Sequence, residues 1–247
     1  MTPSSYWLSY GGGVNSTALT ILLVRGKLPQ YAPWRIVMAD TGDEKERTYA
    51  YIRDVFGPWL EQHGKALETA KPKETVLGRW QRLNVTGSRI IRACSIEGKI
   101  KPIEKHIAAN GGSLGQLIGI DAGEAHRAKD RPGKFYPLVD LDIDRDECEA
   151  IIKAEGLPSP GKSGCWHCPF MRVGEVIELV KTEPCKLAVI ERLENAATEL
   201  HGKTPDGNPR SQWGEYPVSW WRKRAEQGDL FIPERDPLEP CECYDGG

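Results

Sequence analysis

Three consecutive glycines, Gly11 to Gly13, stand between a strand-like segment at residues 6–11 and a helix-like run at residues 16–26. Glycine inside a regular element costs about 0.5–1 kcal/mol relative to alanine, so this run belongs in neither. The pattern predicts a strand, a glycine turn and a helix in succession. Main-chain N–H groups at such a helix start form an anion site. A ligand-free turn is the alternative, but three glycines exceed what a turn needs.

The glycine run matches neither of two common phosphate-binding motifs. No Gly-Lys-Ser/Thr follows at the spacing of a Walker A loop, and the dinucleotide motif fails because position 16 is serine. Ser16 and Thr17 can add hydroxyl donors to the main-chain amides. Asn15 or Ser16 is expected to cap the helix, and Gly26 is expected to end it.

Strand-like and helix-like segments alternate along residues 1–156, which predicts a mostly parallel, twisted sheet with helices on both faces. In that architecture ligands bind at the carboxyl ends of strands, where the glycine run, Asp40 and Asp121 fall. The expected strands are at 6–11, 34–40, 66–70, 114–121 and 136–143. The expected helices are at 16–26, within 41–64, and at 73–83, 99–110 and 144–156.

The sequence becomes rich in turn-forming residues after Gly156, and three parts of the chain are predicted. Residues 1–156 form an α/β domain. Residues 157–200 form a Cys-x-x-Cys knuckle with helices at 172–181 and 184–200. Residues 201–247 form a loop-rich extension that contains a short helix beginning at Val218. The carboxyl-terminal part is therefore expected to be small, helical and cysteine-containing.

Composition excludes several classes of function. The chain of 247 residues is 39% hydrophobic and 28% charged, with a formal net charge of −2, so no overall basic field indicates nucleic acid. No apolar stretch is long enough to cross a bilayer, and the first residues do not read as a signal peptide. We therefore expect a cytoplasmic protein with no membrane partner.

Seven cysteines in a cytoplasmic chain indicate metal or redox chemistry more than disulfides. Cys165 and Cys168 flank His167 in a turn followed by Pro169, a spacing typical of zinc or iron–sulfur ligation. Two free thiols in a turn are the alternative. Cys148, on an amphipathic helix, is expected in the core. The remaining cysteines are Cys94, Cys185, Cys241 and Cys243.

Residues 79–105 hold seven Lys or Arg and two acids. Such a segment can focus an anionic substrate, although for most of these residues a solvated helix face is the better interpretation.

The segment "YGGGVNS" resembles the Ser-Gly-Gly-x-Asp-Ser pyrophosphate loop of the N-type ATP pyrophosphatases, and most closely the branch that contains phosphoadenosine phosphosulfate (PAPS) reductases. Gly12, Gly13 and Ser16 match the motif, whereas Gly11 and Asn15 replace its first Ser and its Asp. Further segments resemble the family in its order: "DTGDEKERTYAYI", "CSIEGKIKPIEKHI", "IGIDAGEAHR" and "SGCWHCPF".

This resemblance implies a Rossmann-like fold of the adenine nucleotide alpha-hydrolase type, with ATP, or PAPS or APS (adenosine phosphosulfate), as the nucleotide. The implied phosphate-binding residues are Gly11, Gly12, Gly13, Asn15 and Ser16, and Asp40, Thr41 and Gly42 line the adenosine side. Ser16, Lys99 and Arg127 take part in the reaction. Asp121 and Glu124 serve Mg²⁺ or the substrate, or are turn residues.

The resemblance also implies a third metal ligand, Cys94, beside Cys165 and Cys168. Cys185 is the preferred fourth ligand, with Cys148, Cys241 and Cys243 left open. The group held is either Zn²⁺ or a [4Fe–4S] cluster.

Three functions follow. The leading one is ATP-dependent adenylation of a nucleobase, a nucleic acid or another small substrate with release of pyrophosphate, after which a sulfur or nitrogen donor displaces AMP. The second is a PAPS or APS reductase in which Cys243 attacks sulfur, with thioredoxin as partner. The third is a nucleotide-binding module without catalysis. The oligomeric state stays open, a homodimer included.

Overall fold

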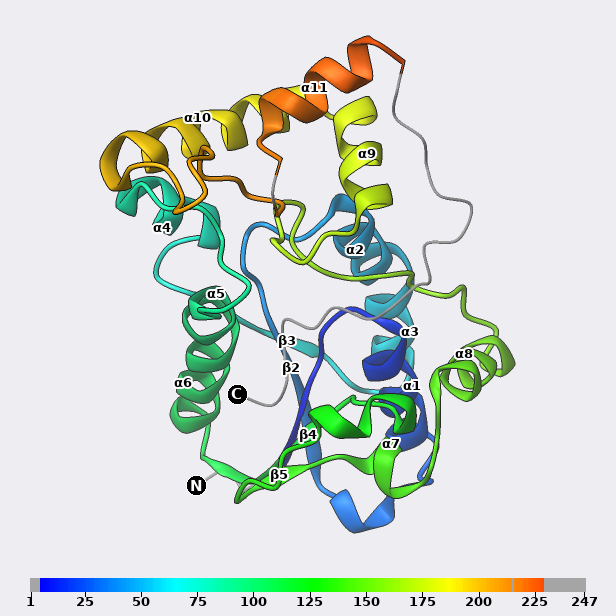
Figure 1. The fold of residues 1–247 in the computed structure, drawn as a ribbon. Coiled ribbons are helices and arrows are strands. Elements are labelled where there is room, and N and C mark those ends of the chain that lie inside the picture. The colour runs from blue at the N-terminus through cyan, green and yellow to red at the C-terminus, as the bar shows by residue number, and fades with distance from the viewer. Residues whose placement is uncertain (1–4, 215, 229–247) are drawn as a thin grey trace. The chain divides into compact units, whose positions relative to one another are not determined.

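A five-stranded sheet forms the centre of the first of two compact units (Figure 1). The computed structural model describes residues 5–214 and 216–228. The strand order is β3-β2-β1-β4-β5, and all four pairings are parallel. The predicted α/β class is therefore confirmed. The strands are β1 (Ser5–Ser9), β2 (Trp34–Ala39), β3 (Leu67–Ala70), β4 (Ser113–Ile118) and β5 (Lys134–Phe135).

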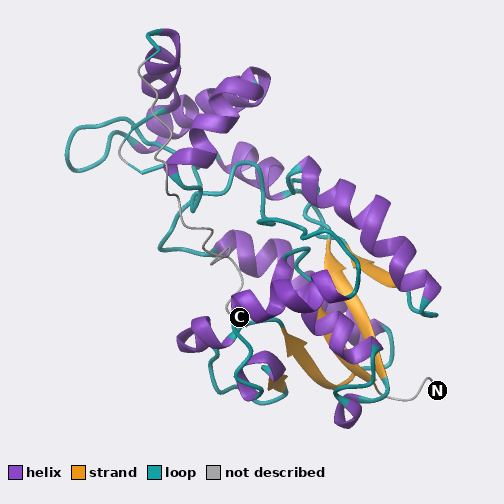
Figure 2. Ribbon diagram, turned by 90° about the vertical axis from the view of Figure 1, so that its right-hand side faces the viewer, coloured by secondary structure: helices purple, strands orange, loops and turns teal. Residues whose placement is uncertain are grey.

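Helices cover both faces of this sheet, because successive strand residues point to opposite sides (Figures 1 and 2). Leu8, Ile36 and Met38 pack in the cluster that contains α1 and α3 residues, whereas Trp7 and Val37 pack with Ile103 and Ile107 of α6. The helices of this unit are α1 (Val14–Val24), α2 (Glu46–Tyr51), α3 (Gly57–Gln62), α6 (Lys101–Ala109), α7 (Pro137–Asp140) and α8 (Arg145–Ala154).

Two π-helical turns precede prolines near the start of a helix. Ile52–Phe56 joins α2 to α3, which has Pro58 in its first turn, and Ile96–Ile100 leads into α6, which has Pro102 there. A proline in a helix removes one main-chain donor, and a π turn widens the backbone around that gap. Lys99 lies on the second π turn, so its position follows from this local irregularity.

Two sequence predictions about this unit are wrong. The expected strand at 136–143 is a two-residue strand, β5, followed by α7, because Pro137 cannot donate to a sheet and suits a helix start. Neither Asn15 nor Ser16 caps α1: Gly13 occupies the cap position, and the Asn15 side chain bonds to Asp121 instead. The helix expected at 144–156 is confirmed as α8, which has a capping box between Asp144 and Glu147.

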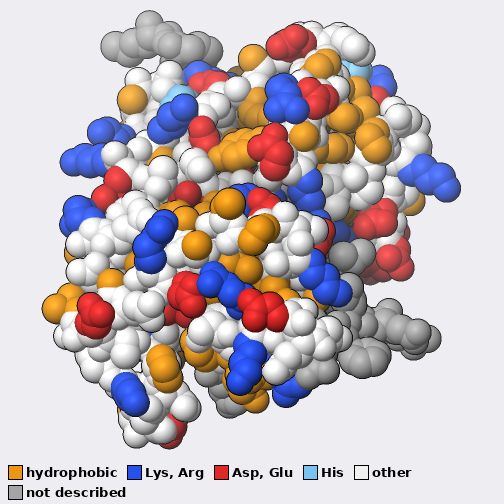
Figure 3. Space-filling view, turned by 90° about the horizontal axis from the view of Figure 1, so that it is seen from above, with side chains coloured by type: hydrophobic (Ala, Val, Ile, Leu, Met, Phe, Trp, Pro, Cys, Tyr) orange, Lys and Arg blue, Asp and Glu red, His pale blue; other side chains and the backbone are white. Residues whose placement is uncertain are grey.

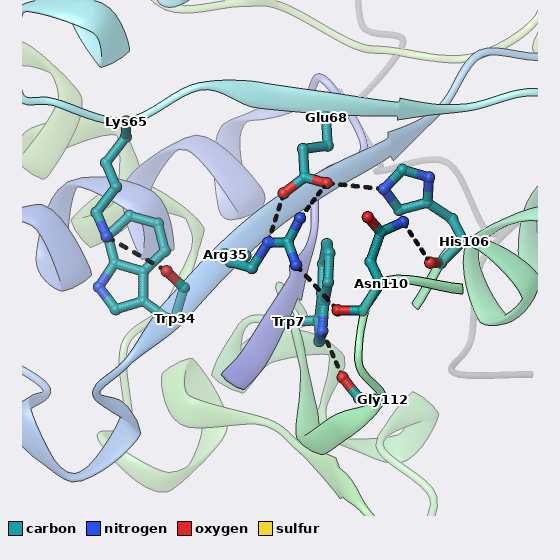
Figure 4. Close-up of polar contacts among 8 residues, drawn as sticks. All are labelled: Trp7, Trp34, Arg35, Lys65, Glu68, His106, Asn110 and Gly112. Atoms are coloured by element: carbon teal, nitrogen blue, oxygen red, sulfur yellow. Dashed lines mark hydrogen bonds and ion pairs between the residues drawn. The ribbon is translucent and has the colours of Figure 1, made fainter. Parts of the chain in front are cut away.

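A polar network ties the end of α6 to the amino-terminal ends of the strands (Figure 4). Arg35 Nε and Nη2 donate to the two Glu68 carboxylate oxygens, each at 2.7 Å, and Arg35 Nη1 donates to the Asn110 carbonyl. His106 Nε2 lies 2.8 Å from Glu68 Oε2, and Trp7 Nε1 donates to the Gly112 carbonyl. The network therefore fixes the edge of the sheet opposite to the glycine turn.

The second unit consists of residues 74–94 and the described residues from 165 onward. The sequence places a boundary at residue 156, whereas these two stretches pack together although 70 residues separate them. The unit is helical, with α4 (Val76–Leu83), α9 (Val173–Thr182), α10 (Pro184–His201) and α11 (Val218–Glu226); the short α5 (Ala93–Ser95) spans the boundary between the two units.

Glu194 on α10 lies in the interior of this second unit, where it is 3% exposed. Its two carboxylate oxygens accept hydrogen bonds from the main-chain N–H groups of Gln212 and Val218, both at 2.8 Å. Burial raises the pKa of Glu194 to about 7, against the opposing effect of those two N–H groups.

We expect Glu194 to make the protein less stable as pH rises. A carboxyl whose pKa is raised on folding holds its proton more tightly in the folded state, so stability falls between about pH 4.5 and pH 7. The loss is at most about 3 kcal/mol, and Glu194→Gln removes it. Thermal melts at pH 5 and pH 8, followed by tryptophan fluorescence, measure the effect. Glu199→Gln, at an exposed position of the same helix, keeps the pH dependence; the same slope in both variants contradicts the assignment.

Candidate active site

The glycine turn joins β1 to α1 at the carboxyl edge of the sheet. Gly11 N donates to Ser16 Oγ at 3.3 Å, and Ser16 Oγ in turn donates to the Gly13 carbonyl at 3.1 Å. Thr17 Oγ1 donates to the same carbonyl at 2.9 Å. Ser16 and Thr17 thus stabilise the turn through hydrogen bonds from their own side chains. The first N–H groups of a helix have no acceptor within that helix, so those of α1 are available at the glycine turn.

The three glycines have different reasons to be glycine. Gly12 has φ +72°, and a Cβ there would lie 2.7 Å from Cγ2 of Thr48. A Cβ at Gly13 would lie 3.0 Å from Ser163 Oγ. At Gly11 the nearest atom would be 4.0 Å away. Position 12 therefore requires glycine because of its positive φ, and position 13 favours glycine because Ser163 lies close to it. Neither reason applies at position 11.

A fourth glycine, Gly119, completes the turn from the end of β4. A Cβ at this position would lie 2.9 Å from both the backbone N and the Cα of Ser16. These are backbone atoms that cannot move aside, so β4 reaches the start of α1 only because residue 119 has no side chain. The sequence analysis missed Gly119, although an isolated glycine in an apolar strand pattern is a signal for close backbone approach.

A cavity of about 120 Å³ lies at this turn, entirely within the first unit. It brings together seven of the predicted site residues from three distant segments, whereas Gly12 is not among its described lining residues. The seven are Gly11, Gly13, Asn15, Ser16, Lys99, Glu124 and Arg127. Its apolar lining includes Met38, Ile118 and Ile120. Residues that were not selected from the sequence also line it, and they include Glu44, Arg145, Lys162 and Ser163.

Two of the basic side chains at the cavity are held by acids. Lys99 Nζ lies 3.0 Å from Glu44 Oε1, and the Glu44 side chain is 1% exposed. Arg127 Nη1 lies 2.6 Å from Glu124 Oε1. These pairs fix each cation in position, and they leave a cavity whose lining holds four bases and two acids.

Asn15 is held between an acid and a base. Its Nδ2 donates to Asp121 Oδ2 at 2.8 Å, and its Oδ1 accepts from Arg145 Nη1 at 3.5 Å. The other Asp121 oxygen accepts from the Glu124 main-chain N–H at 3.1 Å. Both Asp121 oxygens thus accept a hydrogen bond, and a role of this residue toward Mg²⁺ or the substrate stays a prediction. Arg145 carried no signal in the sequence, since it begins a helix whose first turn is acidic.

The residues predicted to line the adenosine side lie beside the cavity. Asp40 Oδ1 accepts from the Tyr49 hydroxyl at 2.7 Å and from the Gly42 N–H at 3.1 Å. Burial opposes ionisation of Asp40, but these donors and Lys71 together lower its pKa. Thr41 is fully buried and its hydroxyl lies 3.5 Å from Glu44 Oε1. None of Asp40, Thr41 and Gly42 is among the described residues that line the cavity, and their contact with a nucleotide stays a prediction.

The predicted metal ligands all lie in the second unit. Cys165 and Cys168 form a turn in which the Cys168 N–H donates to the Cys165 carbonyl at 3.2 Å. Cys94 packs against the cluster of Val76, Trp80 and Leu193, and Cys185 is exposed.

Within residues 5–214 and 216–228, no three His, Cys, Asp or Glu side chains are grouped to hold a metal ion. Binding of Zn²⁺ or a cluster by these cysteines therefore stays a prediction, and we derive no step through either group. Cys241 and Cys243 lie outside the described residues. Cys148 is in the core as expected, where burial raises the pKa of its thiol to about 12.

The structural neighbours of the chain include two solved proteins of named activity. The chain is similar to the PAPS reductase from Candida auris in its phosphate complex, with 17% identity over 67% of this chain and 83% of that chain and a TM-score of 0.46. It is also similar to the U34-tRNA thiolase NcsA from Methanococcus maripaludis with its [4Fe-4S] cluster, with 15% identity over 90% of this chain and 80% of that chain and a TM-score of 0.47.

No protein-family profile matches the chain, and no curated protein matches it. At this degree of likeness neither neighbour carries an argument about the reaction, so the function below rests on the cavity itself. Over the described part of the chain, no helix has the length and apolar character to cross a membrane.

We expect the glycine turn to tolerate substitution unequally. Gly12→Ala should lower the free energy of unfolding by about 1–3 kcal/mol, because its φ of +72° strains any other residue and its Cβ meets Thr48. Gly11→Ala should cost less than about 1 kcal/mol. Urea unfolding of both variants tests this.

The companion variant Gly12→Ala/Thr48→Ser removes the crowding methyl group and should recover part of the loss, but not the part due to the backbone. Equal losses at positions 11 and 12 would show that the turn is not built as described.

Proposed function

We propose that this cavity binds the polyphosphate of an adenine nucleotide and promotes attack of a substrate oxygen on the α-phosphorus of ATP, with release of pyrophosphate. One observation carries the proposal. The start of α1 and four basic side chains, from four other segments of the chain, face one cavity. A helix start and converging cations are an arrangement that stabilises a polyanion. The basic residues are Lys99, Arg127, Arg145 and Lys162.

The reaction balances as a substitution at phosphorus. A lone pair of the substrate oxygen forms the new O–P bond, while the bond from the α-phosphorus to the bridging oxygen breaks. That oxygen leaves on pyrophosphate with the bonding pair, and the substrate keeps AMP. A sulfur or nitrogen nucleophile then displaces AMP from the activated carbon. Mg²⁺ bound to the phosphates spreads the charge of the leaving group.

The chain's own residues position the phosphates and neutralise their charge. The glycine turn offers main-chain donors to the leaving pyrophosphate, and Ser16 holds the turn in shape. Glu44 holds Lys99, and Glu124 holds Arg127, so both cations are oriented before the nucleotide arrives. Preorganised charges need no rearrangement at the moment of reaction, and this is the main source of electrostatic catalysis.

The surface favours a small substrate over a long nucleic acid. Figure 3 shows Lys and Arg side chains mixed with Asp and Glu on the face that it draws, without a continuous basic stripe. The formal net charge of −2 agrees with this. Binding along a phosphodiester backbone draws its affinity from many basic contacts. A free nucleobase, or another small molecule with an oxygen to be activated, is therefore the preferred acceptor.

We expect Lys99→Ala to lower the rate of pyrophosphate release from ATP by about 10²–10³-fold, the usual effect of removing one charge-stabilising donor. Lys101→Ala is the matched control: Lys101 lies two residues further along, is exposed, and pairs with Glu97 on the same helical stretch. Its rate should stay within about twofold of the unaltered enzyme, since surface ion pairs contribute little. A coupled pyrophosphate assay with ATP and a panel of nucleobases measures both.

Three outcomes would replace the proposal. Equal rates for the two variants would remove Lys99 from the reaction. Sulfite release from PAPS or APS with thioredoxin, without pyrophosphate from ATP, would establish the reductase. Tight binding of ATP without turnover under every condition would establish a binding module.

A further inference from the structure

A short stretch of main chain, residues 161–164, crosses the glycine turn from a part of the sequence that none of the phosphate motifs includes. The Gly164 carbonyl accepts a hydrogen bond from the Lys45 N–H at 3.0 Å. Ser163 contacts the turn directly, because a Cβ at Gly13 would lie 3.0 Å from its Oγ and a Cβ at Gly12 would lie 3.8 Å from its Cβ. We call this stretch the 161–164 segment.

The conformation of the 161–164 segment is imposed by its two ends. Gly161 has φ +67° and Gly164 has φ +133°, both in the region that favours glycine. Between these bends stand two polar residues, Lys162 and Ser163, and both line the cavity together with Gly161. An exposed loop that only carries a solvated lysine requires neither two glycines with positive φ nor a main-chain hydrogen bond to a distant segment. The segment is built to hold Lys162 and Ser163 at the turn.

We propose that Lys162 and Ser163 bind the pyrophosphate portion of the nucleotide and so form a second wall of the phosphate site. The inference rests on the proposed function and deepens it. Ser163 lies against Gly12 and Gly13, so a ligand at the turn meets this hydroxyl, and Lys162 lines the same cavity. An ammonium group on a flexible stem is a common point-charge ligand for phosphate.

The proposed placement has a consequence for ligand selectivity. Lys162 and Ser163 contact the phosphates that leave, and they make no contact with the phosphate that stays on AMP. Removal of these side chains should therefore weaken the binding of pyrophosphate and of ATP and should leave the binding of AMP unchanged. A lysine that attracts anions only through the general field would affect all three ligands in proportion to their charge.

The test is calorimetric titration of the full chain with pyrophosphate, ATP and AMP in the presence of Mg²⁺. Lys162→Ala should lower the affinity for pyrophosphate and ATP by about ten- to a hundredfold, since one charge-assisted hydrogen bond is lost. The affinity for AMP should fall by less than about threefold. Lys162→Arg should retain most of the affinity. Ser163→Ala should weaken pyrophosphate by about three- to tenfold.

Lys153→Ala is the control, because Lys153 is exposed on α8 and does not line the cavity. Melting of each variant without ligand verifies that it is folded. If Lys162→Ala binds pyrophosphate as the unaltered chain does, or loses AMP equally, the inference is wrong while the proposed function stands. If the unaltered chain binds none of the three ligands, the proposed function itself fails.

Discussion

The cavity depends on one main-chain contact, between the end of β4 and the start of α1. Gly119 brings the two backbones to a distance at which any Cβ would collide with Ser16. Two residues further on, Asp121 reaches Asn15, and Arg145 reaches the same amide from α8. A larger residue at position 119 would push the strand end away, and the partners of Asn15 would move with it. The site's polar contacts are therefore consequences of a packing constraint.

The ion pairs at the cavity are better understood as positioning devices than as sources of stability. Burying the Glu44 carboxylate costs desolvation energy that a single lysine at 3.0 Å offsets only in part. Thr41, predicted from the sequence to line the adenosine side, has its hydroxyl 3.5 Å from the Glu44 carboxylate. Thr41 contacts Glu44, and Glu44 in turn pairs with Lys99. Thr41, which does not line the cavity, therefore influences the position of the Lys99 ammonium group through Glu44.

Local features of the chain could be predicted from the sequence. The strand–glycine–helix unit and the capping box of α8 follow from the preferences of neighbouring residues, and the parallel sheet follows from alternating segments. The two wrong predictions arose where a contact with a distant residue, or a proline, overrides the local preference of the sequence. Asn15 has good cap chemistry, but Asp121 offers it a stronger partner 106 positions away. Arg145 and Lys162 were not selected from the sequence, because only the fold shows which cavity they line.

The division of the chain into two units separates two chemistries. Every residue that lines the cavity belongs to the first unit, whereas the four predicted metal ligands belong to the second. The chain passes between the units after residues 73, 94 and 164. Lys99 lies five residues beyond the second of these crossings, and Lys162 two residues before the third. Two of the four bases that line the cavity therefore stand within five residues of a point where the chain leaves or enters the first unit.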